Sequence, residues 1–134
     1  MKPIEVLTYV EGEDPVKLAF DAVGRENLDK IEVFNNRVLV ATAPHLERSK
    51  GGLIFTNSTI DENRYQEKVG IVLKCGDTAF EGDDEFKWPN PPSVGSLVFY
   101  RVTDSMEIGV NGVSCRFIAD YSVIGTVSDL GVIW

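Results

Sequence analysis

From residue 37 onward, short apolar runs alternate with polar turns, which is the pattern of β-strands. Strands are predicted at residues 37–42, 68–75, 94–102, 106–110, 113–118 and 122–127. Between the fourth and fifth of these, Asn111-Gly112 is the dipeptide that best suits a type I′ hairpin turn, because both central positions need a positive φ. Several short strands with turn signals and no long helix predict an all-β fold, built as a small β-barrel.

The first thirty residues follow a different pattern. Apolar side chains alternate as in a short strand at Ile4, Val6 and Val10. Asp14-Pro15 then offers a helix N-cap followed by proline at the first helical position. Apolar residues follow at helical spacing at Val16, Ala19, Phe20 and Val23, before Gly24. We therefore expect a strand-helix extension over residues 1–33, a barrel domain over 34–127 and a tail over 128–134.

A long polar stretch, residues 44–64, keeps neither a helical nor a strand period. Loops of this length are uncommon in compact domains and are usually functional or disordered. Two glycines and an apolar triplet lie in its middle, namely Gly51, Gly52, Leu53, Ile54 and Phe55. An apolar cluster in such a loop is poorly placed to reach the core. We expect it to fold into a groove on a partner protein.

The composition fits one globular domain, since 43% of the 134 residues are hydrophobic and 25% are charged. A formal net charge of −8 argues against nucleic acid or an anionic membrane as partner, because both require a basic surface. No apolar run approaches the roughly 20 residues of a membrane span, and the N-terminus lacks the apolar core of a signal peptide. We therefore expect a cytoplasmic protein.

Enzymatic chemistry is not visible, because a nucleophilic enzyme needs a nucleophile, a base and an orienting group. His45 is the only histidine, and we expect a plain polar loop residue there. The acidic side chains of residues 77–93 do not match the spacing of a calcium-binding loop and indicate a solvated loop. Cys75 and Cys115 lie in apolar runs, where inert buried thiols are expected. We therefore predict no enzyme, no metal and no cofactor.

Read in order, the strand motifs resemble the co-chaperonins of the GroES type. The matching pieces are residues 36–40, 49–54, 70–73 with Gly76, 94–99, the hairpin around Asn111-Gly112, and 121–127. The match covers roughly residues 34–127. A glycine pair beside an apolar triplet is a weak signal alone, but its place between these strands makes the whole pattern specific.

The resemblance implies an irregular β-barrel and a seven-membered ring, a homo-heptamer. Such a ring caps a GroEL-type chaperonin when that cylinder holds nucleotide, and it encloses a client protein for folding. By position, Gly51 and Gly52 would begin a mobile loop, and Leu53, Ile54 and Phe55 would dock into the apical groove. Residues 77–92 would form the roof loop around the opening of the dome, with the members Glu81, Asp83, Asp84, Glu85 and Trp88.

The sequence departs from the family pattern in three places. Phe55 is bulkier than the aliphatic residue usual at the third position of the triplet. The roof loop is long and contains Phe80, Phe86 and Trp88, and the first thirty residues have no counterpart in the standard bacterial form. Such divergence is typical of a phage-encoded member. Two alternatives stay open, a structural or virion subunit that reuses the barrel and an enzyme or small-ligand barrel.

Overall fold

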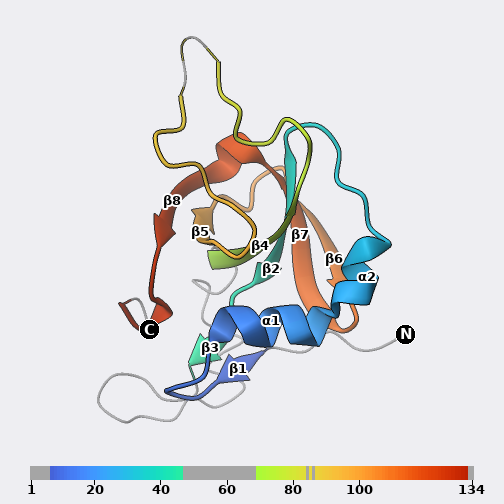
Figure 1. Ribbon diagram of the computed structural model, residues 1–134, viewed down its shortest axis with the longest axis vertical. Coiled ribbons are helices and arrows are strands. Elements are labelled where there is room, and N and C mark those ends of the chain that lie inside the picture. The colour runs from blue at the N-terminus through green and yellow to red at the C-terminus, as the bar shows by residue number, and fades with distance from the viewer. Residues whose placement is uncertain (1–6, 47–68, 84, 86, 133–134) are drawn as a thin grey trace.

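Six antiparallel strands form the main sheet, in the order β6-β7-β2-β4-β5-β8 (Figure 1). The computed structural model describes residues 7–46, 69–83, 85 and 87–132. The strands are β2 (Arg37–Thr42), β4 (Val69–Cys75), β5 (Leu97–Tyr100), β6 (Met106–Val110), β7 (Val113–Ala119) and β8 (Val123–Val127). A separate pair, β1 (Thr8–Tyr9) and β3 (His45–Leu46), is parallel. The helical elements are α1 (Pro15–Val23), α2 (Arg25–Asp29), η2 (Asp120–Ser122) and η3 (Leu130–Val132). The described fold is mainly β, as predicted.

All six strands predicted after residue 37 are present, two of them with the predicted bounds. The strand predicted at 94–102 is shorter, because Gly95 at φ +94° and a bond from the Ser96 N–H to the Ser93 carbonyl turn the chain before β5. The predicted hairpin turn is confirmed, since Asn111 and Gly112 have φ values of +51° and +82°. Local turn chemistry therefore determines where these strands begin and end.

Both faces of the main sheet are apolar, and each face has its own core. Successive side chains of β2 point to opposite faces, so Leu39 and Ala41 join one cluster and Val38 and Val40 the other. The first core also contains Val69, Ile71, Leu73, Leu97, Val113 and Cys115. The second also contains Val72, Val98, Tyr100, Ile118 and Val123. Such a sheet requires a cover on each side.

Helices α1 and α2 cover the first core, and Figure 1 shows α1 lying across one end of the sheet. Ala19, Phe20 and Val23 of α1 and Leu28 of α2 are buried in this core. The predicted start of α1 is confirmed, because Asp14 Oδ1 accepts a hydrogen bond of 3.0 Å from the Val16 N–H. The apolar face of the N-terminal helix therefore packs on the sheet of its own chain.

A β-bulge brings one lysine to the helices. Leu39 pairs with Lys74 and Val40 pairs with Val72, which leaves Leu73 as the extra residue of β4. In a regular strand, Leu73 and Lys74 would point to opposite faces. Here Leu73 enters the first core, and Lys74 Nζ donates to the Leu28 carbonyl at 2.8 Å and also to the Ile31 carbonyl. The bulge thus lets a cation satisfy carbonyl groups at the end of α2.

The prediction that His45 is a polar loop residue is wrong. His45 lies in β3 and is fully buried. The N-terminal extension causes the burial, since β1 pairs with β3 and the His45 N–H donates to the Leu7 carbonyl at 2.8 Å. The strand predicted around residues 4–10 is described only at Thr8–Tyr9, and Ile4 and Val6 lie outside the described residues. None of the helices in the described part is long and apolar enough to cross a bilayer.

Candidate functional site

The residues expected to bind a chaperonin, Gly51, Gly52, Leu53, Ile54 and Phe55, lie outside the described residues. The structure places the two ends of the segment that contains them. The Ala43 N–H donates to the Val69 carbonyl at 3.0 Å, so the chain leaves β3 and re-enters β4 at the same end of the sheet. The two ends of the connection over residues 47–68 are therefore close to each other, at one end of the sheet.

The 77–92 loop begins at the opposite end of β4, where Figure 1 shows it projecting beyond the sheet. Its base is tied to the residues before β2. The Asn35 N–H donates to Asp77 Oδ1 at 2.9 Å, and the Thr78 N–H donates to the Asn35 carbonyl at 3.1 Å. Gly76 permits this approach, because a Cβ there would lie 2.1 Å from the Asn35 oxygen. The loop therefore starts from a fixed point.

Phe80 turns inward from this loop and is held by Asp120 of η2. Its backbone has φ +63°, a left-handed conformation that is rare for a bulky residue. The Phe80 N–H donates to Asp120 Oδ2 at 3.0 Å, and the other oxygen, Oδ1, accepts from Asn36 Nδ2 at 3.2 Å. One carboxylate thus joins the loop, η2 and the residues before β2. No local pattern in the sequence indicated this role for Asp120.

Trp88 packs against Phe80, with ring centroids 4.9 Å apart and an interplanar angle of 83°. Phe80 is buried in the second core, and Trp88 is half-buried against it. Edge-to-face aromatic contacts of this kind stabilise beyond the burial of their surface. Trp88 was expected to surround a roof opening. It instead packs on the inner side of the loop, against Phe80, and helps to cover the second core.

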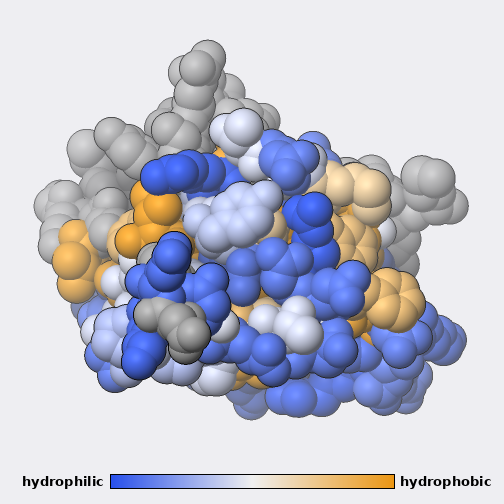
Figure 2. All heavy atoms as spheres, turned by 90° about the horizontal axis from the view of Figure 1, so that it is seen from above, coloured by the Kyte–Doolittle hydropathy of each residue, from blue (hydrophilic) through white to orange (hydrophobic). Residues whose placement is uncertain are grey.

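The acidic residues occupy the outer side of the same loop. Glu81, Asp83 and Glu85 are exposed, and Asp84 lies outside the described residues. The Glu85 N–H donates to Asp83 Oδ1 at 2.9 Å, which stabilises a local turn. Seen from above, this end of the molecule has a mainly hydrophilic surface, with hydrophobic groups towards its sides (Figure 2). The 77–92 loop thus has an apolar inner side and an acidic outer side.

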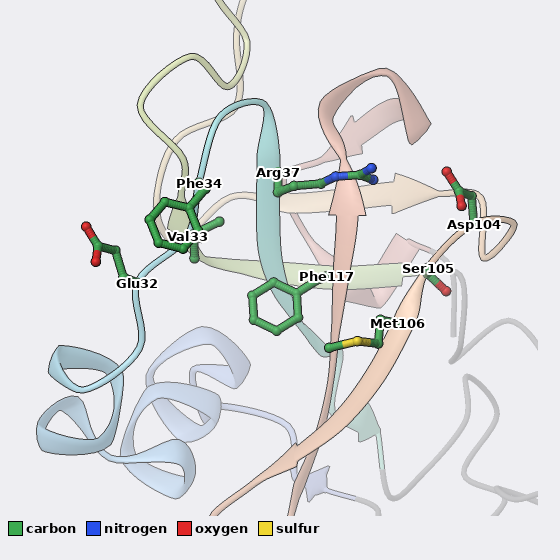
Figure 3. A pocket seen from close by; sticks show the side chains of 8 residues that line it. All are labelled: Glu32, Val33, Phe34, Arg37, Asp104, Ser105, Met106 and Phe117. Atoms are coloured by element: carbon green, nitrogen blue, oxygen red, sulfur yellow. The ribbon is translucent and has the colours of Figure 1, made fainter.

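A groove of about 430 Å³ lies beside the N-terminal ends of β2 and β6. Phe117 of β7 lies between Phe34 on one side and Met106 on the other (Figure 3). Phe34 is 63% exposed and Met106 is 57% exposed. The lining is completed by Glu32, Val33, Arg37, Asp104 and Ser105. No pattern in the sequence predicted this groove, although Phe34 is followed by two asparagines.

The two cysteines lie on opposite faces of the sheet and are both free. Cys115 is fully buried in the first core, and burial raises the pKa of its thiol to about 12. Cys75 packs against the second core and is half-buried, which also raises its pKa. A raised pKa leaves less of the reactive thiolate. The prediction of a buried thiol is confirmed for Cys115, whereas Cys75 is only partly covered.

Within the part of the chain that the structure describes, no group of three or more His, Cys, Asp or Glu side chains could hold a metal ion. The chain matches no protein-family model and no curated protein. The functional interpretation therefore depends on the arrangement of the described elements and on the sequence pattern.

Proposed function

We propose that this protein is a co-chaperonin of the GroES type. In this proposal, copies of the chain form a homo-heptameric ring with an irregular β-barrel in each subunit. The ring caps a GroEL-type chaperonin in its nucleotide-bound state and encloses a client protein for folding in the cytoplasm. The apical domains bind residues 51–55, and the 77–92 loop forms the roof.

The observation that best supports this proposal is the position of the two long connections. Residues 47–68 join β3 to β4 at one end of the sheet, and the 77–92 loop begins at the other end. A lid needs this separation, because one end of each subunit must meet the cylinder while the other closes the dome. The order and spacing of the strand motifs support the same proposal.

The apolar triplet Leu53, Ile54 and Phe55 has the energetics that a reversible lid requires. Burying three such side chains contributes about 1.5–3 kcal/mol each. Ordering a flexible segment opposes this with roughly 2–5 kcal/mol. Each contact is therefore weak on its own. Seven contacts made by one ring add through effective concentration, so the lid can bind firmly and still be released cooperatively.

A structural or virion subunit is the second candidate. The exposed side chains of Phe34, Met106 and Ile124 would suit any larger assembly, whether or not it binds a chaperonin. The two functions differ in their need for the triplet, because a structural subunit has no use for Leu53, Ile54 and Phe55 in a long loop.

Nucleotide-dependent binding to a chaperonin tests the proposal. The purified protein is mixed with a GroEL-type chaperonin, with and without nucleotide, and comigration is measured by size-exclusion chromatography. We expect comigration only with nucleotide. Ile54→Asp should abolish it, because the carboxylate would enter an apolar groove unpaired. Ile60→Asp, in the same segment but outside the triplet, is the matched control and should bind.

Sedimentation of the free protein provides an independent check on the ring. We expect one species far heavier than the 14.8 kDa chain. A persistent monomer at micromolar concentration, or equal binding by the Ile54→Asp and Ile60→Asp variants, would contradict the proposal.

A further inference from the structure

The hairpin turn between β6 and β7 carries a reactive dipeptide, Asn111-Gly112. Glycine after asparagine favours deamidation, because no Cβ hinders attack of the glycine nitrogen on the asparagine side chain. Asn111 is exposed, and the strand ladder ends at the pair Val110 and Val113, so the Gly112 nitrogen lies outside the ladder. The dipeptide is thus accessible to solvent, and its reactivity does not depend on the function of the protein.

The side chain of Asn111 also holds the end of helix α1. Its Nδ2 donates a hydrogen bond of 2.9 Å to the Ala22 carbonyl, 89 residues away. Ala22 lies in the last turn of α1, where carbonyl groups have no partner within the helix. The Gly24 N–H makes the last regular helical bond, to the Phe20 carbonyl, and the Val23 carbonyl accepts from Asn27 Nδ2. Asn111 is therefore one of two side-chain donors that complete the helix end.

We propose that Asn111 is a deamidation site that the docked helix protects, and that its conversion releases the end of α1 from the hairpin. In the reaction, the Gly112 nitrogen loses its proton and bonds to Asn111 Cγ. The Cγ–Nδ2 bond breaks, and ammonia leaves with a proton. Water then opens the cyclic imide to aspartate or isoaspartate. Water is the only other reactant, and no oxidant or metal is needed.

Protection follows from the hydrogen bond to Ala22. While Nδ2 donates to that carbonyl, the carboxamide is held against the helix and cannot turn freely towards the Gly112 nitrogen. Local opening of the helix end frees it. Conversion should therefore become faster under any condition that opens α1 without unfolding the whole protein.

The release follows from a gain of negative charge and the loss of a hydrogen-bond donor. An amide that donates to Ala22 becomes a carboxylate, which can only accept. The new negative charge also lies at the negative end of the helix dipole, where it is unfavourable. Phe20 and Val23 of α1 share the first core with Val113. A loosened helix end would therefore expose part of that core next to the hairpin.

Peptide mapping of the intact protein tests the modification. The folded chain is held in mildly alkaline buffer, and conversion at Asn111 is followed by mass spectrometry in increasing sub-denaturing urea. Asn36 is the internal reference, because its Nδ2 is also hydrogen-bonded but Arg37 follows it. We expect Asn111 to convert several-fold faster than Asn36, with a rate that rises with urea. A rate no faster than that of Asn36 at every urea concentration would overturn the proposal.

Two variants test the release. Asn111→Asp and Asn111→Gly both remove the donor to Ala22, and both residues tolerate the positive φ of this turn. Only Asn111→Asp adds the negative charge. We expect hydrogen exchange in the last turn of α1 to be several-fold faster in Asn111→Asp than in Asn111→Gly. Equal exchange in the two variants would show that the charge does not release the helix.

Discussion

Asp120 and Phe80 lie 40 residues apart, yet Asp120 Oδ2 accepts a hydrogen bond of 3.0 Å from the Phe80 backbone N–H. This bond fixes the point at which Phe80 of the 77–92 loop enters the second core. A bulky residue in the left-handed conformation stores about 1–3 kcal/mol of strain and persists only where its surroundings enforce it. Two contacts hold Phe80 in this conformation. One is the hydrogen bond to Asp120, which lies outside the loop, and the other is the ring contact with Trp88 of the loop itself.

Asp120→Ala should destabilise the protein by about 1–3 kcal/mol, because it leaves the part-buried Phe80 N–H without its acceptor. Urea unfolding measures the effect. Glu81→Ala, which removes an exposed acid of the same 77–92 loop, is the matched control and should shift stability by less than about 0.5 kcal/mol. If both variants unfold alike, Asp120 does not hold the loop.

Trp88→Ala should lower the free energy of unfolding by roughly 2 kcal/mol, below the range of about 3–5 kcal/mol for fully buried aromatic residues. The reason is that Trp88 is only half-buried, although it covers Phe80 and the second core. The exposed neighbour Lys87 provides the control Lys87→Ala, and urea unfolding compares the two. An unchanged midpoint for Trp88→Ala would mean that the indole does not pack on this core.

Phe20→Ala should cost about 3–5 kcal/mol, because the ring is buried between α1 and the first core. Lys17→Ala changes an exposed position of the same helix and should have little effect on the free energy of unfolding.

Deletion of residues 1–30 should prevent folding of the sheet, because it removes the helices that cover the first core. Circular dichroism would detect this loss. A truncated chain with native strand content and cooperative melting would show that the helices are dispensable.

Stability should fall at alkaline pH. The native pKa of Cys115 is raised by burial from 9.0 to about 12, so the unfolded chain loses this proton first. The stability that the protonated thiol contributes is complete below pH 9 and is lost as pH rises towards 12. Burial and the negative charge of Asp129 also raise the pKa of Tyr9. The titration of Tyr9 therefore also lowers stability as the pH rises.

Urea unfolding at neutral pH and in steps above pH 9 measures this loss. In the Cys115→Ala variant, the lower starting stability should decline less steeply with pH, because one titrating group is gone. Identical slopes for the variant and the natural chain would contradict the assignment to Cys115.

Elements set by local chemistry were predictable from the sequence. The Asp14-Pro15 cap, the Asn111-Gly112 turn and the apolar run of β2 each act over a few residues, and each produced the expected element. The burial of His45 was not predictable, because it depends on β1 arriving from the N-terminal extension. The bulge that redirects Lys74 and the groove beside Phe34 likewise depend on strands that are distant in the chain.

Only part of the candidate site was predictable from local sequence. The acidic residues of the 77–92 loop were predicted as solvated, and Glu81, Asp83 and Glu85 are exposed. The inward position of Trp88 was not predicted, because a tryptophan among acids and prolines carries no period from which a face can be inferred. It follows from the contact with Phe80, which in turn needs Asp120. The binding of residues 51–55 to a chaperonin stays a prediction.

The sheet order has a consequence for solubility. Among the described strands, β6 pairs only with β7 and β8 pairs only with β5, so both are edges. An edge strand can recruit another chain and start aggregation unless a charge interrupts it. Strand β6 carries Glu107, whereas β8 contains no charge and exposes Ile124. An isolated subunit would therefore be most vulnerable along β8, and a lysine at the exposed position Thr126 would be the simplest protection against aggregation.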